Sequence, residues 1–330
     1  MSQNKLIEIK DLHTHFFTEA GTAKAVDGVS FDIYKGEVLG IVGESGSGKS
    51  VTSLSINRLI PNPPGEIVSG EIIYNGVNLL EVSYEEMRNY RGKDISMIFQ
   101  EPMTSLNPVL QIRVQMNEVI IRHLGLSDKE ATKQSIDMLK SVGIPDPEQR
   151  INEYPHQFSG GMRQRVMIAM SLLCNPALLI ADEPTTALDV TIQAQILDLM
   201  IKLKEKREGA AILLITHDLS VIAETCDRVI VMYGGKIQEI ATVKELFKNP
   251  LHPYTKALMD SIPKMNQKVD RLKALKGMVP SILEMGDGCK LCSRFDPEDC
   301  ACGGTREEPK LTEPMPGHFV RCNPKVLENG

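Results

Sequence analysis

The sequence predicts an α/β fold with a buried sheet covered by helices, followed by a small loop-rich C-terminal region. Two observations predict the α/β core. Short apolar runs alternate with helical patterns before residue 250, and a glycine-rich loop follows one of these runs. Composition predicts the C-terminal region, because five of the 7 cysteines and eight of the 19 prolines fall after residue 250.

Length and charge limit the classes of protein to consider. A chain of 330 residues is long enough for about two domains. The formal net charge of −6 argues against a surface built mainly to bind nucleic acid, which needs clustered Lys and Arg. No apolar run approaches the roughly 18 to 20 residues of a membrane span, and the first ten residues lack the apolar core of a secretory signal. We therefore expect a soluble intracellular protein.

The apolar runs are rich in Ile, Val and Leu on both faces, which is typical of strands buried between helices. They cover residues 6–12, 37–43, 94–100, 177–182, 210–216 and 228–233. Residues from about 101 to 176 differ, because they contain helical patterns without a clear buried strand; these patterns cover 112–124, 128–142 and 160–174. We predict a helical insertion between two strands of the sheet.

A phosphate-binding loop follows the run at 37–43. The motif G-x-x-x-x-G-K-S comprises Gly43, Glu44, Ser45, Gly46, Ser47, Gly48, Lys49 and Ser50, and Val51 opens a helical run. Backbone N–H groups of such a loop surround phosphates, the lysine reaches the β and γ oxygens, and the serine hydroxyl binds Mg²⁺. A surface turn could match by chance, but the strand before the motif and the helix after it favour the nucleotide site.

A second acidic site ends the apolar run at 177–182. Asp182 at the strand tip is placed to hold the Mg²⁺ shell, and Glu183 is placed to orient and deprotonate the attacking water. On its own this pattern is more typical of a solvated strand end. Its combination with the loop at 43–50 favours catalysis.

Residues 158–165 resemble the signature sequence of ABC ATPases. Ser159, Gly160 and Gly161 open a helix, so a hydroxyl and backbone N–H groups form a second anion site. In the resembling family this site closes over the nucleotide of the partner subunit. Phe158 and Met162 depart from the commoner Leu-Ser-Gly-Gly-Gln form, and we expect activity to survive this departure.

The resemblance places four further elements in order along the chain. Gln100 matches the Q-loop glutamine that contacts Mg²⁺ and the attacking water, and Asp189 matches the D-loop. His217 matches the switch histidine, which contacts the γ-phosphate. Phe16 matches the aromatic residue that stacks on adenine, although the adjacent Phe17 and a nearby insertion make the register ambiguous, and apolar packing is its alternative role.

The resemblance also implies an overall organisation. The expected fold is a P-loop ABC ATPase with a RecA-like sheet core, an antiparallel β subdomain and a helical subdomain. We expect the nucleotide-binding domain at 1–250, with its helical subdomain at about 101–176, and a metal-binding extension at 251–330. The expected cofactors include ATP and Mg²⁺, with the metal held by Ser50, Gln100 and Asp182.

Residues 99–108 and 252–255 resemble the peptide and nickel importer branch of this family, in particular its D-type subunit. Membership would imply an ATPase that powers import of dipeptides or oligopeptides from the cytoplasmic face of the cell membrane. The implied partners are a second ATPase subunit, different or identical, two integral membrane permease subunits, and a periplasmic or extracellular peptide-binding protein. Nucleic acid is not an expected partner.

The late cysteines predict a metal centre in the extension, because disulfides are disfavoured in a reducing cytosol. The favoured ligands are Cys289, Cys292, Cys300 and Cys322, with Cys302 as the substitute. The resemblance implies a four-iron four-sulfur cluster, zinc suits the same donors, and unliganded thiols are a third possibility. Two other cysteines are expected to pack as small apolar residues, namely Cys174 and Cys226.

Three other functions fit parts of the pattern. A soluble ABC-type ATPase acting on nucleic acid or ribosomes would be expected to have tandem ATP sites, a long coiled coil or basic arms, and the sequence contains none of these. Nickel import fits the same subfamily. A metabolic P-loop kinase has no use for the signature at 158–162.

Overall fold

The computed structural model describes residues 4–100, 105–184, 190–205, 207–261, 277–296, 300–323 and 326. The described residues form two compact units. The helical unit draws on 1–6, 33–37 and 81–214, and the P-loop unit draws on 7–32, 38–80 and 215–330. Among the described residues, no helix is both long and apolar enough to cross a membrane.

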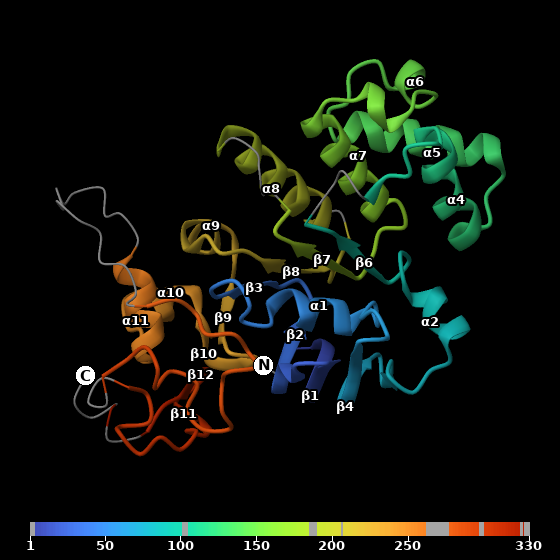
Figure 1. Cartoon of the computed structure of the whole chain (residues 1–330). Helices are drawn as coiled ribbons and strands as arrows, with labels where there is room; N and C mark the ends of the chain where they lie inside the picture. Colours follow the sequence, from blue (N-terminus) through green and yellow to red (C-terminus); the bar gives the residue numbers. More distant parts are fainter. Residues whose placement is uncertain are drawn as a thin grey trace. The chain divides into compact units, whose positions relative to one another are not determined.

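The helical unit combines buried strands with a group of helices (Figure 1). Its parallel strands β6 and β7 pair Ile95 with Leu178 and Ile98 with Ala181, and β8 is the next neighbour of β7. The strands are β6 (Ile95–Ile98), β7 (Leu178–Asp182) and β8 (Ala211–Ile215). The helices are α2 (Tyr84–Tyr90), α4 (Ile112–Leu124), α5 (Asp128–Ser141), α6 (Pro147–Arg150), the 3₁₀ turn η1 (Pro155–Gln157), α7 (Gly160–Leu172) and α8 (Val190–Glu205).

Local sequence explains where these helices begin. Ser127 caps α5 in a reciprocal capping box with Glu130, and Ser159 accepts the Met162 N–H at the start of α7. Their apolar faces share one core, to which Ile112, Met116, Ile120, Leu139, Val166 and Ala169 contribute. The described part of 101–176 contains helices and no strand, as the apolar pattern predicts.

The P-loop unit contains two groups of strands. One is a four-stranded antiparallel sheet in the order β2-β1-β4-β5, formed by β1 (Lys5–Thr18), β2 (Gly21–Tyr34), β4 (Gly65–Tyr74) and β5 (Val77–Asn78). In the other, neighbouring strands follow the order β3-β9-β10-β12-β11. Its members are β3 (Val38–Val42), β9 (Arg228–Tyr233), β10 (Lys236–Thr242), β11 (Leu311–Met315) and β12 (His318–Arg321). The helices are α1 (Lys49–Ile56), α9 (Leu219–Thr225), α10 (Val243–Lys248) and α11 (Pro253–Asp260).

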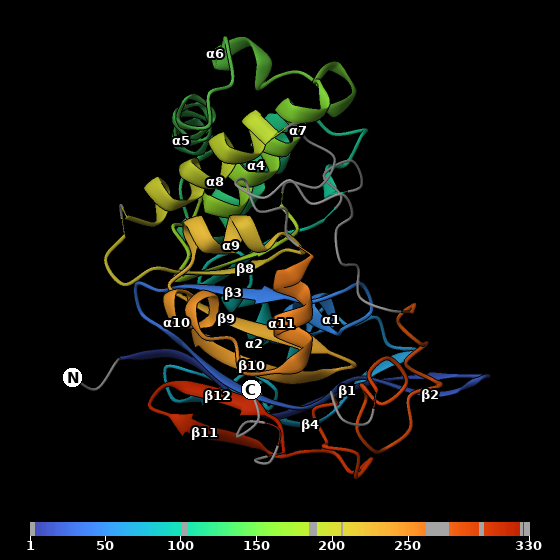
Figure 2. The same ribbon diagram turned by 90° about the vertical axis from the view of Figure 1, so that its left-hand side faces the viewer.

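The C-terminal extension is part of the P-loop unit. Strand β12 pairs with β10, with Val320 opposite Glu239, and Figure 2 shows β11 and β12 beside that strand. Leu291, Cys300 and Val320 belong to the same buried cluster as core residues of β9, α10 and α11. A loop-rich extension was predicted, and the paired strands β11 and β12 are an addition to that prediction. The domain boundary at residue 250 stays a prediction.

Candidate nucleotide site and thiolate cluster

The loop at 43–50 connects β3 to α1, as the motif requires. Gly43 and Gly48 have φ angles of +154° and +98°. A Cβ at these positions would lie 2.2 Å from the Met232 carbonyl oxygen and 2.4 Å from the Ala25 carbonyl oxygen. Both positions therefore require glycine for conformational and packing reasons. Ser45 and Gly46 are exposed at the loop's outer side, and Ser47 is buried.

Lys49 lies inside this loop. Its Nζ donates to the carbonyl oxygens of Gly43 at 2.8 Å and Glu44 at 3.0 Å, and it lies 3.4 Å from Ser47 Oγ. Helix α1 starts at Lys49 with Gly48 as its N-cap, so Ser50 and Val51 occupy its first turn. The geometry offers a buried ammonium and a helix N-terminus at one point, which suits a phosphate chain.

Phe16 faces the same side of β1 as the buried Thr14, whose hydroxyl lies 2.8 Å from Ser55 Oγ of α1. The Phe16 ring packs against Gly65 of β4 and is half-buried. Phe17 points to the other side and is 50% exposed. The structure thus separates the two aromatic candidates. Phe16 shares its face with the contact to α1, and its role in stacking on adenine stays a prediction.

In the helical unit, three predicted site residues follow or end β6 and β7: Gln100, the predicted Mg²⁺ ligand Asp182 and the predicted base Glu183. Asp182 is the last residue of β7 and is 4% exposed. Glu183 follows with a φ of +45°, an uncommon conformation for a residue with a side chain. Gln100 Nε2 donates to Glu183 Oε2 at 3.1 Å. The structure therefore brings Gln100 to the predicted base, although 83 residues separate them in sequence.

The signature residues open α7. Ser159 Oγ accepts the Met162 N–H at 3.3 Å, and the buried Phe158 ring anchors the turn. A Cβ built at Gly160 or Gly161 would meet no atom within 4 Å among the described residues. Packing within the described chain therefore does not require glycine at either position, and Ser159 and Gly160 at the start of α7 are exposed.

The two remaining predicted residues are placed differently. His217 follows β8 and is exposed. The next residue, Asp218, caps α9 by accepting the Ser220 N–H at 2.8 Å. Asp189 lies outside the described residues, so its predicted role stays untested.

Four thiols gather in the extension. The Sγ atom of Cys300 lies 3.5 Å from that of Cys289, 3.7 Å from that of Cys292 and 3.5 Å from that of Cys302. The Sγ atoms of Cys292 and Cys302 are 3.4 Å apart. The Cys300 thiol donates to Cys289 and so lowers the pKa of Cys289 to about 6, which favours the thiolate form that binds metals. We call these four residues the thiolate cluster.

Cys322 is outside the thiolate cluster. Its Sγ donates to the Ala301 carbonyl oxygen at 3.4 Å, and burial raises the pKa of its thiol to about 12. Cys302, and not Cys322, lies with the other three thiols in the structure, and which four cysteines bind a metal stays a prediction. Cys174 is half-buried and burial raises its pKa to about 11, and the half-buried Cys226 contacts the core.

Comparison with solved structures identifies the fold. A dimeric ATP-binding cassette in a post-hydrolysis state, bound to ADP and Pi, is similar with a TM-score of 0.64 and 27% identity, covering 72% of this chain and 98% of that chain. The CbiO1 subunit of a Clostridium perfringens ABC transporter complex gives a TM-score of 0.61 and 28% identity, with 75% and 92% coverage. The predicted ABC ATPase fold is confirmed.

Family models match two parts of the chain: the ABC transporter family at residues 26–186, and the oligopeptide/dipeptide transporter C-terminal region at 238–302. A probable peptide ABC transporter ATP-binding protein of Sinorhizobium fredii is 53% identical over 96% of this chain and 94% of its own. A dipeptide transport ATP-binding protein of Bacillus subtilis is 49% identical over 96% and 94%. The chain belongs to the oligopeptide/dipeptide transporter family of ABC ATP-binding proteins. The predicted ATPase class is confirmed by this membership.

The donor set of the thiolate cluster suits both predicted metals. All four Sγ atoms lie within 4.8 Å of one another. Zinc binds four thiolates around one ion, and in a four-iron cluster each thiolate binds a different iron. Four convergent thiols fit either group, so the identity of the metal stays a prediction.

Sequence reasoning missed Arg294, which joins the extension of this ABC ATPase to its phosphate-binding loop. Its guanidinium forms a bidentate ion pair with the Glu44 carboxylate, and the Arg294 side chain is 2% exposed. The two residues are 250 positions apart. No local spacing could reveal this pair. Its only signal was an acidic residue in a loop that binds anions.

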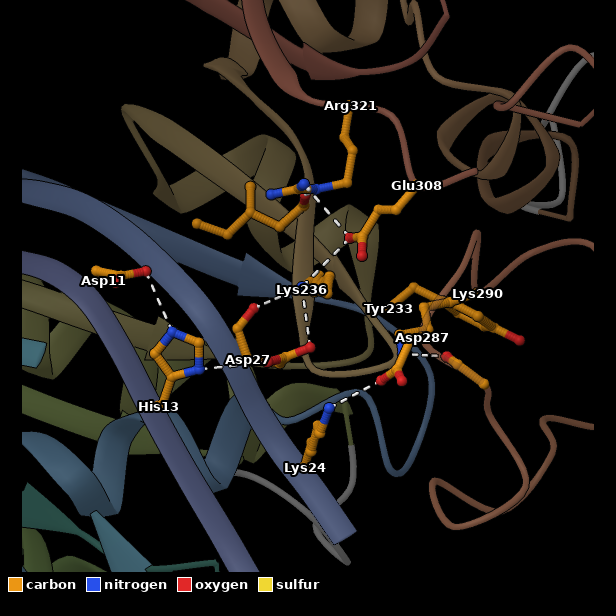
Figure 3. Close-up of polar contacts among 12 residues, drawn as sticks. Asp11, His13, Lys24, Asp27, Tyr233, Lys236, Asp287, Lys290, Glu308 and Arg321 are labelled. Carbon is orange, nitrogen blue, oxygen red and sulfur yellow. Dashed lines mark hydrogen bonds and ion pairs between the residues drawn. The ribbon is translucent and has the colours of Figure 1, made fainter. Parts of the chain in front are cut away.

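A second group of ion pairs joins the extension to β2 and β10 (Figure 3). Lys236 Nζ lies 2.9 Å from Asp27 Oδ2 and 3.4 Å from Glu308 Oε1, which also lies 3.4 Å from Arg321 Nη1. On the other side of Asp27, Oδ1 lies 3.2 Å from His13 Nδ1. Strands β1, β2 and β10 are thereby tied to the residues that precede and end the β11–β12 hairpin.

Proposed function

We propose that this chain is the ATP-hydrolysing subunit that powers import of dipeptides or oligopeptides through an ABC transporter. The observation that carries the proposal is the pair of phosphate-handling arrangements: Lys49 enclosed by its loop, and Gln100 bonded to Glu183 beside Asp182. The names of the relatives, which include peptide, dipeptide and oligopeptide transport ATP-binding proteins, support peptides as the cargo.

In the proposed mechanism the chain positions ATP and neutralises charge. Lys49 and the loop N–H groups bind the β and γ phosphates, with Phe16 against adenine. Mg²⁺, held by Ser50, Gln100 and Asp182, would neutralise charge on the transferred phosphoryl group.

Hydrolysis then needs an oriented water and a closed site. Glu183 accepts the proton of the attacking water, and its hydrogen bond from Gln100 fixes its carboxylate. His217 contacts the γ-phosphate. Ser159, Gly160 and Gly161 of one subunit close the site of the other, and Asp189 keeps the D-loop role that the resemblance implies.

The proposed partners follow from this role. A second ATPase subunit, different or identical, completes the two nucleotide sites, while two integral membrane permeases carry the peptide. A periplasmic or extracellular binding protein delivers it. The chain would act peripherally at the cytoplasmic face of the cell membrane. Copurification with permease subunits separates this proposal from a soluble ATPase acting on nucleic acid or ribosomes.

Replacing the predicted base tests the mechanism. In the Glu183→Gln variant of the reconstituted transporter, we expect ATP turnover to fall by at least about 100-fold, the lower range for losing a general base, with ATP binding preserved. Phosphate release and equilibrium nucleotide binding would be measured side by side. Glu153→Gln, in the same unit, is the control. Wild-type turnover in the Glu183 variant would remove the assignment.

Cargo is tested in the same complex. Peptides of two to about six residues should stimulate ATP hydrolysis only when the binding protein and both permeases are present. Nickel is the alternative cargo. Stimulation by Ni²⁺ with no response to peptides would replace peptide import by nickel import.

We also propose that the extension binds a metal through thiolates. The resemblance implies a four-iron cluster, and zinc is the alternative that suits the same four thiolates. In protein purified without oxygen, we expect a brown chromophore that absorbs near 400 nm and about four irons per chain. Colourless protein with one zinc per chain would establish zinc instead.

Two serine variants, one inside and one outside the thiolate cluster, test which cysteines bind the metal. Cys302→Ser should abolish metal binding, because its sulfur belongs to the thiolate cluster. Cys322→Ser should retain the metal, because that thiol bonds to the Ala301 carbonyl oxygen. Metal loss in the Cys322 variant alone would restore the set favoured by the sequence.

A further inference from the structure

Arg294 is a buried cation that contacts the phosphate-binding loop. Its two terminal nitrogens contact the two carboxylate oxygens of Glu44, with Nη2 and Oε1 3.2 Å apart. Nη2 also donates to the Gly277 carbonyl oxygen at 3.2 Å, and Cζ lies 5.8 Å from the centre of the Tyr233 ring. Planar bidentate geometry, burial and ring contact together restrict this side chain to one position.

Glu44 is in turn fixed at three points. Its side chain pairs with Arg294, its N–H donates to the Tyr254 hydroxyl at 3.1 Å, and its carbonyl oxygen accepts from Lys49 Nζ at 3.0 Å. The Tyr254 and Tyr233 rings contact each other with centres 4.9 Å apart. A displacement of Arg294 would therefore move the carbonyl group to which the phosphate-binding lysine is bonded.

Arg294 also belongs to the segment that carries the thiolate cluster. It lies two residues after Cys292, and its N–H donates to the carbonyl oxygen of Leu291 at 2.9 Å. Leu291 is 1% exposed and packs in the core cluster with Cys300 and Cys302. The short turn at 289–294 thus connects the two sites. Its thiols, from Cys289 and Cys292, belong to the thiolate cluster, and the guanidinium of Arg294 pairs with the Glu44 carboxylate.

We propose that Arg294 is a positioning residue for nucleotide binding, and that the thiolate cluster holds the phosphate-binding loop through it. The carboxylate of Glu44 has the same charge sign as the phosphates of a bound nucleotide. Arg294 neutralises this carboxylate and orients the backbone that contacts Lys49. The cluster supplies a fixed point for a turn with little apolar content of its own.

Nucleotide binding to the full-length chain tests the proposal, with trinitrophenyl-ATP as the probe and no hydrolysis required. Arg294→Gln should weaken binding by at least about fivefold, the lower range for coupling between sites. Arg306→Gln removes an exposed arginine from the same extension and should leave the affinity within about twofold. Equal affinities of Arg294→Gln and wild-type protein would overturn the proposal.

Two double variants test the route. Once Glu44→Gln has removed the partner charge, adding Arg294→Gln should weaken binding little further. Once Arg294→Gln is present, Cys302→Ser should add nothing, although alone it weakens binding in the same direction. Additive effects in the first cycle would remove the positioning role, and additive effects in the second would remove the link to the thiolate cluster.

A second variant keeps the test valid if Arg294→Gln fails to fold. Arg294→Lys keeps the positive charge but loses the bidentate geometry, so it should also weaken nucleotide binding. In the assembled transporter the Arg294 variants should raise the KM for ATP more than they lower kcat. The inference rests on the proposed ATPase role. A wild-type transporter that never hydrolyses ATP would defeat that role, whereas an unchanged KM would defeat only the inference.

Discussion

At the scale of single residues, buried polar groups hold the P-loop unit together. Glu239 is fully buried and accepts the N–H groups of Leu251 and His252 at 2.8 and 3.0 Å. It also pairs with His318 Nε2 of β12 at 2.7 Å. His252 then caps α11 by accepting the Tyr254 N–H at 3.1 Å. One carboxylate therefore connects β10, the start of α11 and the last strand of the extension.

His252 should make the stability of this unit depend on pH. Burial is the largest cause that lowers its pKa from 6.5 to about 4. Between these values the unfolded chain binds a proton that the folded chain does not, so the free energy of unfolding falls as pH decreases from about 6.5 to 4. The loss from this group approaches about 3 kcal/mol. Urea unfolding at several pH values measures it.

His252→Asn is the control for that titration. Asparagine can still accept the Tyr254 N–H as a helix cap, but it does not ionise in this range. The variant should lose this part of the pH dependence while α11 stays folded. An unchanged pH profile would show that His252 is not the group responsible.

Some residues of the site could be predicted from local sequence, and others could not. The loop at 43–50 and the pair Asp182 and Glu183 follow strands whose apolar pattern is continuous, so motif and context agree. The pair of Glu44 and Arg294, and the position of Cys302 beside the other three thiols of the cluster, depend on long-range folding of the chain. The spacing of cysteines along the sequence predicts which neighbouring thiols can lie close together. It does not predict which distant segment of the chain packs against them.

At the scale of elements, two helices of the insertion, α5 and α7, begin at serine caps that have different roles. Ser127 and Ser159 both accept N–H groups, at the starts of α5 and α7. The cap of α5 is closed by Glu130 in a capping box, whereas α7 begins with two glycines and an open N-terminus. The first arrangement serves folding alone, and the second also suits an anion.

Alanine substitutions separate these roles. Ser159→Ala and Ser127→Ala should each lower the free energy of unfolding by about 1 kcal/mol, the usual cost of losing an N-cap. Only Ser159→Ala should also lower ATP hydrolysis in the assembled transporter. Chemical unfolding and steady-state phosphate release would be measured for both variants. Equal hydrolysis rates would argue against a role of the signature serine at the partner's nucleotide.

The periodicity of apolar residues predicted two kinds of element well: strands that are buried on both faces, and helices that bury one apolar face. The strand at 228–233 and the helix at 112–124 coincide with β9 and α4. Periodicity failed for β11 and β12 because both strands are short. Strand β11 contains Pro314 and has three exposed residues between two half-buried ones, and β12 alternates buried and half-buried residues over only four positions. Pairing with β10 stabilises them, and the local sequence does not record that pairing.

At the scale of the whole molecule, the extension contributes to the core that supports the phosphate-binding loop. Leu291, Val320 and three of its cysteines lie in one buried cluster with Val42 at the end of β3. The extension also covers the edge of β10 through β12. A nucleotide-binding domain ending near residue 250 would expose this apolar surface and an unpaired strand edge.

Truncation should therefore destabilise the part of the chain that binds nucleotide. We expect a chain ending at residue 276 to unfold at a lower temperature than the full chain, to aggregate more readily, and to bind ATP more weakly. Differential scanning calorimetry, light scattering and nucleotide titration measure the three effects. A shortened chain that retains full stability and affinity would show that the extension is an independent appendage.

The order in which the chain is made has a consequence for the ATP site. The P-loop unit joins residues 7–80 to residues 215–330, while most of the helical unit is continuous from 81 to 214. Domains fold as units during synthesis, with earlier segments first. The phosphate-binding loop therefore leaves the ribosome long before Arg294 and the thiolate cluster exist to hold it. Full assembly of the nucleotide site must therefore await translation of the segment at 289–302, so a chain terminated before that segment would carry the motif without its support.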